Sequence, residues 1–189
     1  MLIVRDLLIG PKRFSDLQRG LPGIPTNVLT ARLKELEEAG VVERRVLPLP
    51  ERGLAYQLTE YGTDLDKVVV EIGRWGAKRL GDPRRDQTIT TDSILTALRT
   101  TFQPKAARSV SASYELRVGP VHVHAIVSRG KLTTGEGPLP HADLVIETGP
   151  ALRAVMAGEV SPADAIKNGS VHVQGDKRLL AQFVELFKI

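Results

Sequence analysis

The chain contains no cysteine, and aromatic side chains make up only 4% of its 189 residues. Without cysteine, these residues cannot form disulfides, thiolate nucleophiles or cysteine-ligated zinc sites. No apolar run is long enough to span a membrane. The apolar residues 1–4 are too few for a signal peptide, because Arg5 and Asp6 follow them directly. These absences favour a cytoplasmic location with no membrane partner.

Charge is nearly balanced along the chain, with 26 basic and 22 acidic residues and a net charge of +4. Residues 1–81 hold 13 basic and 11 acidic residues, and residues 82–189 hold the same numbers. Neither half therefore carries the strong positive charge that alone would indicate a nucleic-acid partner. Any DNA-binding surface must come from the local arrangement of basic side chains.

A polar segment with glycine and proline divides the sequence. Residues 82–88 follow Gly81 and include Pro83, and no apolar period crosses them. We expect a linker here, with one domain over residues 1–81 and a second over residues 89–189. Each segment is long enough to bury a core of its own.

The first segment has the pattern of short helices joined by a tight turn. Residues 2–9 are helical in pattern but have no capping residue before them, which predicts that upstream residues are missing from this chain. Ser15 is placed to cap a second helix that ends at Gly20. A turn rich in proline and glycine over residues 21–25 separates it from a third helix, which opens at residue 25 or 26.

The third helix separates an apolar face from a polar one. Leu29, Leu33 and Leu36 recur at i, i+4 and i+7, so they should share the face that packs on the core. Gly40 should end the helix, because a left-handed residue is favoured at that position.

A β-ribbon and a long helix complete the first segment. Residues 41–47 and 54–58 suit paired strands with a hairpin tip between them. Thr59 is placed to cap a helix over residues 61–80. This order of elements predicts a winged helix-turn-helix, a fold that reads DNA.

Two kinds of side chain on this layout suit DNA. Small polar residues near the start of a recognition helix can reach base edges, and basic residues farther out can meet phosphates. Arg52 at the hairpin tip is placed to enter a minor groove. We predict the following DNA contacts: Lys12, Arg13, Thr26, Asn27, Thr30, Arg32, Lys34, Arg44 and Arg52. The alternative is an ordinary solvated helix face, and Glu38 near the same face would repel phosphate.

The second segment reads as one sheet with flanking helices, so the whole chain is predicted to be α+β. Alternating apolar residues predict strands over residues 113–118, 121–128, 131–135, 142–147 and 171–175. Helical spacing predicts helices over residues 90–102, 152–157, 162–167 and 179–187. Gly130 suits a tight turn between two of the strands.

No catalytic or metal-binding constellation stands out in the second segment. His122 and His124 point the same way along one strand, but no Cys, Asp or Glu lies beside them at ligand spacing. Ser128, His141 and Asp143 lack the nucleophile motif of a hydrolase. We therefore predict no enzyme activity, no metal and no cofactor.

The amphipathic helices of the second segment can enclose an apolar pocket or close a core. A pocket for a lipid-like ligand would be lined from the helix faces. The candidate pocket residues are Leu98, Phe102, Val155, Met156, Phe183 and Phe187. Composition alone favours the closed core, and the sequence leaves both alternatives open.

Residues 2–81 resemble the HxlR-type winged-helix repressors of bacteria. The resemblance rests on four stretches taken together: LIVRDLL (2–8), GPKRFSDL (10–17), VLTARLKELEEAGVVER (28–44) and YQLTEYG (56–62). It implies a homodimer on a two-fold DNA site, with the helix over residues 61–80 contributing to the dimer. Some members of this family sense oxidants through an upstream cysteine, and the lack of cysteine here does not support such sensing.

Residues 88–189 resemble the sterol carrier protein type-two fold. The likeness is carried by ADLVIET (142–148), VSPADAI (160–166) and GSVHVQGD (169–176). It implies an α/β domain with a mixed sheet, flanking helices and a hydrophobic tunnel for lipid-like molecules, without fixing a ligand.

Together these features predict a bacterial transcriptional regulator, most simply a repressor, that binds double-stranded DNA as a homodimer. Its second domain would bind an apolar small molecule or help the dimer assemble. The alternative is a lipid-binding or carrier protein whose winged helix mediates protein contacts. A small hydrolase using His122 or His124 is a weaker third hypothesis.

Overall fold

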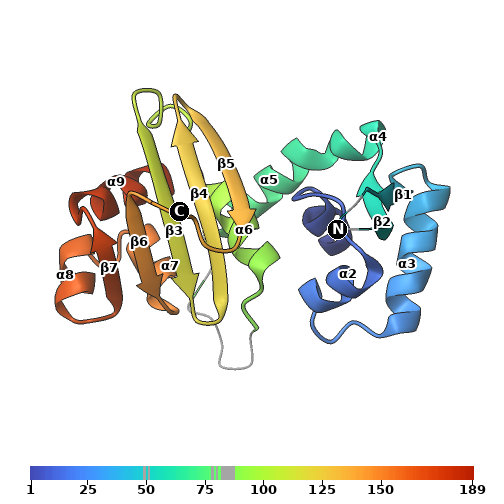
Figure 1. Cartoon of the computed structure of the whole chain (residues 1–189), viewed down its shortest axis with the longest axis horizontal. Helices are drawn as coiled ribbons and strands as arrows, with labels where there is room; N and C mark the ends of the chain where they lie inside the picture. The colour runs from blue at the N-terminus through green and yellow to red at the C-terminus, as the bar shows by residue number, and fades with distance from the viewer. Residues whose placement is uncertain (49, 51, 78, 80, 82–87) are drawn as a thin grey trace. The chain divides into compact units, whose positions relative to one another are not determined.

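The computed structural model describes residues 1–48, 50, 52–77, 79, 81 and 88–189. The chain divides into two units, Met1–Gly73 and Arg74–Ile189 (Figure 1). The first unit carries helices and a β-ribbon, and the second carries a mixed sheet with flanking helices, which confirms the predicted α+β class. The predicted linker stays a prediction, because residues 82–87 lie outside the described residues.

Helices precede and follow the β-ribbon of the first unit. Its elements are α1 (Leu2–Leu7), α2 (Phe14–Gly20), α3 (Thr26–Glu38), β1 (Val42–Leu47), β2 (Gly53–Leu58), α4 (Glu60–Thr63) and most of α5 (Leu65–Ala77), whose last residues belong to the second unit. The two strands are antiparallel. Lys12, in the segment before α2, pairs with Tyr56 of β2 through two backbone hydrogen bonds. The N–H of Lys12 donates to the carbonyl of Tyr56 at 2.9 Å, and the N–H of Tyr56 donates to the carbonyl of Lys12 at 2.7 Å.

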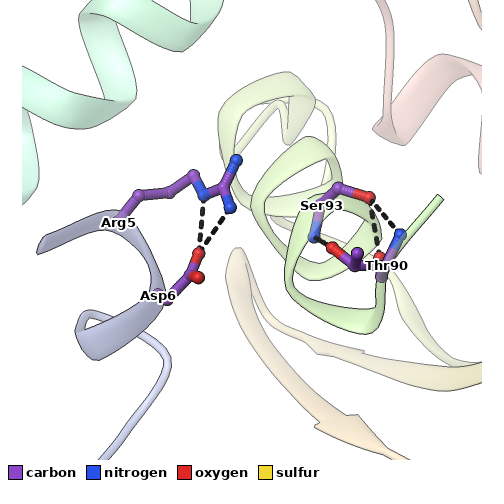
Figure 2. Close-up of polar contacts among 4 residues, drawn as sticks. All are labelled: Arg5, Asp6, Thr90 and Ser93. Carbon is purple, nitrogen blue, oxygen red and sulfur yellow. Dashed lines mark hydrogen bonds and ion pairs between the residues drawn. The ribbon is translucent and has the colours of Figure 1, made fainter. Parts of the chain in front are cut away.

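The first unit closes around one apolar core. Its buried members come from the helices and the base of the ribbon: Ile3, Val4, Leu7, Leu17, Leu21, Leu29, Leu33, Val42, Leu58 and Val69. The predicted core face of α3 is confirmed at Leu29 and Leu33, whereas Leu36 is half-buried. Asp6 is fully buried in α1 and accepts from Nε of Arg5 at 2.7 Å (Figure 2).

The ends of α2 and α3 show how local chemistry sets helix length. Gly40 ends α3 in a left-handed backbone conformation, with φ of +68°, as predicted. The N–H of Val41 donates to the carbonyl of Leu36 at 2.9 Å. The predicted cap at Ser15 is wrong. The helix α2 begins one residue earlier, and the Asp16 carboxylate accepts from the N–H of Arg13 at 3.2 Å, so Ser15 lies inside the helix.

The predicted long helix over residues 61–80 is interrupted. Thr59 caps α4 as predicted, with its Oγ1 accepting from the N–H of Gly62 at 3.0 Å, but α4 ends before Asp64 and α5 begins after it. A Cβ on Gly62 would collide with the carbonyl oxygen of Val41, so the first turn is held against the ribbon by backbone contact. Glycine is also a weak helix former, which favours a break nearby. Residues 78 and 80 lie outside the described residues.

A five-stranded mixed sheet organises the second unit. Its elements are α6 (Thr91–Thr101), β3 (Ser111–Val118), β4 (Val121–Ser128), β5 (Lys131–Glu136), β6 (Leu144–Thr148), α7 (Ala151–Met156), α8 (Pro162–Lys167), β7 (Val171–Gly175) and α9 (Arg178–Leu186). The strand order is β5-β4-β3-β6-β7, with β3 and β6 parallel and the other neighbours antiparallel. The helix α6 starts at a reciprocal cap in which Thr90 and Ser93 exchange hydrogen bonds of 3.0 and 3.2 Å (Figure 2).

One face of this sheet is covered by helices. Along β4, the side chains at odd-numbered positions 121–127 are buried, while His122, Ile126 and Ser128 between them are exposed. The helices α6 and α9 pack on the covered face (Figure 1). This confirms the alternation of apolar and polar residues that predicted a sheet with one covered face. Gly130 occupies the β4–β5 turn with φ of +80°, as predicted for a tight turn. Within the described residues, every helix is too short or too polar to cross a lipid bilayer.

Candidate nucleic-acid interface

The polar face of α3 presents small side chains near its start. Thr26, Asn27 and Thr30 are all exposed. Nε2 of Gln18 on α2 donates to Oγ1 of Thr26 at 2.9 Å, which ties the two helices of the helix-turn-helix together. Oγ1 of Thr30 donates to the carbonyl of Thr26 at 2.8 Å. The Asn27 side chain makes no hydrogen bond within the described part of the chain, so its amide is available for a base edge.

Two basic residues of α3 are paired with acidic residues of the same helix. Nη1 of Arg32 lies 2.6 Å from Oε2 of Glu35, and Nζ of Lys34 lies 3.7 Å from Oε1 of Glu38. All four side chains are more than half exposed, and exposed ion pairs of this kind are weak. Both cations can therefore exchange their carboxylates for phosphates.

Arg44 is bound more firmly. Its guanidinium makes two contacts with Glu37, Nε to Oε1 at 2.8 Å and Nη2 to Oε2 at 3.1 Å, and it lies over the ring of Tyr56 at 5.7 Å. The hydrogen bond to Glu37 raises the pKa of Arg44 above its usual value, with smaller contributions from the charges of Tyr56 and Glu37. Arg44, which the sequence predicts to contact phosphate, thus links β1 to α3 in the free protein.

Two of the remaining predicted cations, Arg13 and Arg52, meet at the end of the ribbon. Nη2 of Arg13 donates to the carbonyl of Arg52 at 3.4 Å, and a Cβ on Gly53 would lie 3.5 Å from Cζ of Arg13. The Arg13 guanidinium thus lies in van der Waals reach of the backbone at Gly53. Arg52 is exposed and its side chain has no partner among the described residues. Lys12 lies on the segment that pairs with β2.

Some contributors to this surface are missing from the sequence-based prediction. Gln18 positions Thr26, and Glu37 holds Arg44. Val46 and Leu54 are directly opposed on the ribbon and are 73% and 50% exposed. Val46 and Leu54 share the ribbon face of the buried Val42 and Leu58, so strand alternation alone predicts them to be buried and does not reveal their exposure. The two polar contacts join different elements and leave no local signal.

The candidate pocket residues of the second unit lie in a closely packed core. The ring centroids of Phe183 and Phe187 are 4.6 Å apart, those of Phe102 and Phe187 are 5.6 Å apart, and Tyr114 packs against Phe183 at 5.2 Å. All six predicted residues are buried: Leu98, Phe102, Val155, Met156, Phe183 and Phe187. A ligand pocket among them stays a prediction.

The histidines of β4 are placed on the open face of the sheet. His122 is exposed, and Nδ1 of His124 lies 3.1 Å from the carbonyl of Gly137. Within the described residues, no group of three or more His, Cys, Asp or Glu side chains is arranged to hold a metal ion. The carboxylate of Asp143 accepts from the N–H and the hydroxyl of Ser113, at 2.8 and 2.7 Å.

Glu115 is a buried carboxylate on the same face. It accepts from Nε of Arg117 at 2.7 Å and from the N–H of Leu139 at 3.0 Å. Burial raises its pKa, but these hydrogen bonds and the charges of Arg117 and His122 outweigh that effect and hold the pKa of Glu115 below its usual value. The carboxylate is thus fully engaged in structure.

Comparison with known proteins shows that residues 1–83 match the HxlR-like helix-turn-helix family. The HTH-type transcriptional regulators YvaP and YodB of Bacillus subtilis are 43% and 45% identical over 77 and 74 residues. These matches cover 41% and 39% of this chain, and 71% and 66% of the relatives. The HTH-type regulator Rv3095 of Mycobacterium tuberculosis is 37% identical over 83 residues, covering 44% of this chain and 52% of its own length.

Among solved structures, the reduced form of B. subtilis YodB is 40% identical, with a TM-score of 0.37 over 44% of this chain and 81% of that one. The sec-alkylsulfatase Pisa1 of Pseudomonas is 23% identical, with a TM-score of 0.49 over 53% of this chain and 17% of that one. A likeness at the latter level assigns no function to either unit. The identity to YvaP extends over more than two thirds of that regulator, and the chain belongs to the HxlR-like helix-turn-helix family.

Proposed function

We propose that the chain is a bacterial transcriptional regulator, acting as a repressor, that binds duplex DNA as a homodimer through α3 and the tip of the ribbon. The observation that carries the proposal is the unengaged amide of Asn27 on the exposed face of α3, in a unit whose family includes transcriptional regulators. The helix α3 would enter the major groove, and Arg52 at the ribbon tip would enter the adjacent minor groove.

The distribution of engaged and unengaged side chains supports separate roles. Asn27 would read a base edge, whereas Arg32 and Lys34 would exchange weak internal ion pairs for phosphates. Arg13 approaches the backbone of Arg52 and would help to hold the ribbon tip in position. Sequence preference is therefore expected from α3, and a general gain in affinity from the basic residues.

The test is fluorescence anisotropy with labelled duplex from upstream of the gene and a scrambled duplex, across a salt series. Arg52→Ala should weaken binding to the native duplex about tenfold, or ~1–2 kcal/mol. Asn27→Ala should reduce the preference for the native duplex over the scrambled one. Lys167→Ala, on α8 of the second unit, removes a cation as a control. Wild-type protein that binds both duplexes weakly and equally would reject the proposal.

The homodimer is supported by an uncovered apolar stripe on α5. Val68 and Ile72 are 49% and 51% exposed, and Trp75 follows three positions later on the same helix at 75% exposure. The three side chains are spaced i, i+4 and i+7, which places them on one helix face. Large exposed apolar stripes of this kind mark protein–protein contacts, and a second copy of α5 would cover this one through a two-fold axis.

Sedimentation velocity tests the dimer. Ile72→Glu should convert the dimer to monomer and weaken binding to a two-fold DNA site, because it introduces a charge into an apolar contact. Lys67→Glu, five residues earlier at an exposed position of α5, serves as the control for an added negative charge. A wild-type protein that sediments as a monomer at micromolar concentration would reject this arrangement.

For the second unit, we propose binding of an apolar small molecule that shifts the balance between DNA-binding and non-binding states. The support is the aromatic cluster that Phe183 and Phe187, at the end of α9, form with Phe102; these rings are packed against one another, so a ligand would have to displace them. A fatty acid series added to the anisotropy assay tests the coupling. Ligands that bind the protein and leave its DNA affinity unchanged would reject it.

A further inference from the structure

The β4–β5 turn is joined to the segment that precedes β3 (Figure 1). The N–H of Gly130 donates to the carbonyl of Ala107 at 2.8 Å, and the N–H of Arg129 donates to the carbonyl of Val110 at 3.0 Å. Ala107 is fully buried. The two segments therefore form one fixed surface, in which the side chains they carry keep their places relative to one another.

Four cationic residues lie on the two joined segments around Gly130. Arg129 and Lys131 flank it in sequence. A Cβ on Gly130 would lie 3.3 Å from the carbonyl oxygen of Pro104, the residue before Lys105, and 3.8 Å from Cα of Arg108. All four cationic side chains are exposed. We call Lys105, Arg108, Arg129 and Lys131 the basic cluster.

The basic cluster is not neutralised from within the unit. Residues 103–110 and 128–132 contain no acidic residue. None of the four cations forms an ion pair within the part of the chain that the structure describes. Other arginines of the same unit are paired at short range: Arg117 with Glu115 at 2.7 Å, and Arg178 with Asp176 at 2.7 Å. The two arginines of the cluster thus differ from these in being left for an external anion.

We infer that the basic cluster binds the phosphate backbone of duplex DNA, giving the second unit a contact of its own with the nucleic acid. This inference rests on the proposed function and deepens it. Four exposed cations without enclosing polar groups are a poor site for a single small anion. They suit a partner with densely repeated phosphates, such as duplex DNA. Contacts from Lys and Arg to phosphate add affinity without reading sequence.

Because the two units belong to one chain, even a weak contact of the second unit with DNA can increase the affinity of the whole protein. Once α3 is on its site, the basic cluster meets nearby phosphates at high local concentration, so even a weak contact increases the overall affinity. The cluster should therefore tighten binding to native and scrambled duplexes alike and leave the preference between them to the first unit.

Matched lysine pairs test the inference in the full chain. Lys105→Gln with Lys131→Gln removes two charges from the cluster, and Lys167→Gln with Lys177→Gln removes two exposed charges elsewhere on the same unit. The affinity of each protein for native and scrambled duplex is measured across a salt series. The cluster pair should reduce the slope of log K against log salt by about 1.8, since each phosphate contact contributes about 0.9. The control pair should leave the slope unchanged, and neither pair should alter sequence preference.

A second variant guards against a folding defect. Arg108→Gln with Arg129→Asn should reduce the slope by a similar amount; asparagine is chosen because Arg129 has φ of +49°, which asparagine tolerates. Circular dichroism confirms that each variant is folded. Equal loss of slope in the cluster and control pairs would overturn the inference, because net charge alone would then explain it.

The remaining outcomes separate the two proposals. Wild-type protein that prefers the native duplex, together with cluster variants of unchanged slope, would overturn the inference and leave the proposed function standing. Wild-type protein that binds neither duplex would reject both. Binding to vesicles of phosphatidylglycerol that the cluster pair abolishes, with an unchanged DNA slope, would assign the cluster to a lipid surface instead.

Discussion

Arg44 and Glu37 form a two-point ion pair that joins the ribbon to α3, with Nε–Oε1 and Nη2–Oε2 distances of 2.8 and 3.1 Å. The pair lies on the first unit, and its guanidinium also covers the ring of Tyr56. A basic residue of the predicted DNA surface is thus engaged before DNA arrives. The free protein therefore offers less positive charge on this surface than its composition suggests.

Glu37→Gln should raise DNA affinity. The change releases Arg44 for phosphate and removes a negative charge beside the DNA, so we expect tighter binding by about two- to fivefold, the range typical of exposed ion pairs. Anisotropy with the native duplex at fixed salt measures the change. Glu185→Gln, which alters net charge equally on the second unit, is the control. Weaker binding by the Glu37 variant would show that the ion pair holds the ribbon in its binding position.

Gly62→Ala should destabilise the first unit. A methyl group there would collide with the carbonyl oxygen of Val41, and because that atom belongs to the backbone, the fold must shift. We expect a loss of about 1–3 kcal/mol in the free energy of unfolding, measured with urea. Gly76→Ala on α5 is the matched control, because nothing lies within 4 Å of its Cβ. That change should be neutral or add up to ~1 kcal/mol; equal effects at the two positions would contradict the packing argument.

Tyr114 should make the second unit sensitive to alkali. Burial, and secondarily the charge of Asp143, raise the pKa of this phenol to about 12. Because the folded pKa lies above the unfolded value near 10, the stabilising effect is complete below about pH 10 and is lost as pH rises toward 12.

Tyr114→Phe tests this dependence. At neutral pH the variant should be less stable by about 1 kcal/mol, because it lacks the hydrogen bond from the phenol to Oε1 of Gln182 at 2.9 Å. The difference should narrow or reverse between pH 10 and 12, where only the wild type must ionise this group. Urea unfolding at pH 7 and pH 11 measures both differences; a constant difference would rule out the pH effect.

His124 and Gly135 should be energetically coupled. The imidazole lies over the backbone of Gly135, where a Cβ would collide with Nε2. Gly135→Ala should force the ring away and break its contact with the carbonyl of Gly137, at a cost of about 1 kcal/mol. The same change in a His124→Ala background should cost less. A double-mutant cycle by urea unfolding measures the coupling, and strictly additive effects would contradict it.

Sequence patterns predicted the regular elements well where burial is periodic. The strands of the second unit alternate because helices cover only one face of the sheet, so each strand carries a readable pattern. Helix ends were predictable where a single residue decides them, as at Gly40 and Thr59. The cap of α2 was missed because a hydrogen bond from the Arg13 backbone to Asp16 replaced the expected serine.

The contacts of the candidate site were harder to predict from the sequence than the helices and strands. Which cations stay unengaged depends on side chains brought together by the fold, as Glu37 and Arg44 show. The break at Asp64 lies two residues after Gly62, whose backbone contacts Val41, and no apolar periodicity records either feature. The basic cluster likewise draws Lys105 and Lys131 together from segments on either side of two strands.

The parallel pairing of β3 with β6 has a consequence for the order in which the protein assembles. The central strand β3 ends at Val118, and its parallel neighbour β6 begins only at Leu144, after β4 and β5 have been made. The backbone pairing of Phe102, at the end of α6, with Phe187 likewise cannot form until Phe187 has been synthesised. Pairings between distant segments are slow to form, whereas the helix-turn-helix depends on near neighbours. On the ribosome, the first unit should thus fold while the second is still being synthesised.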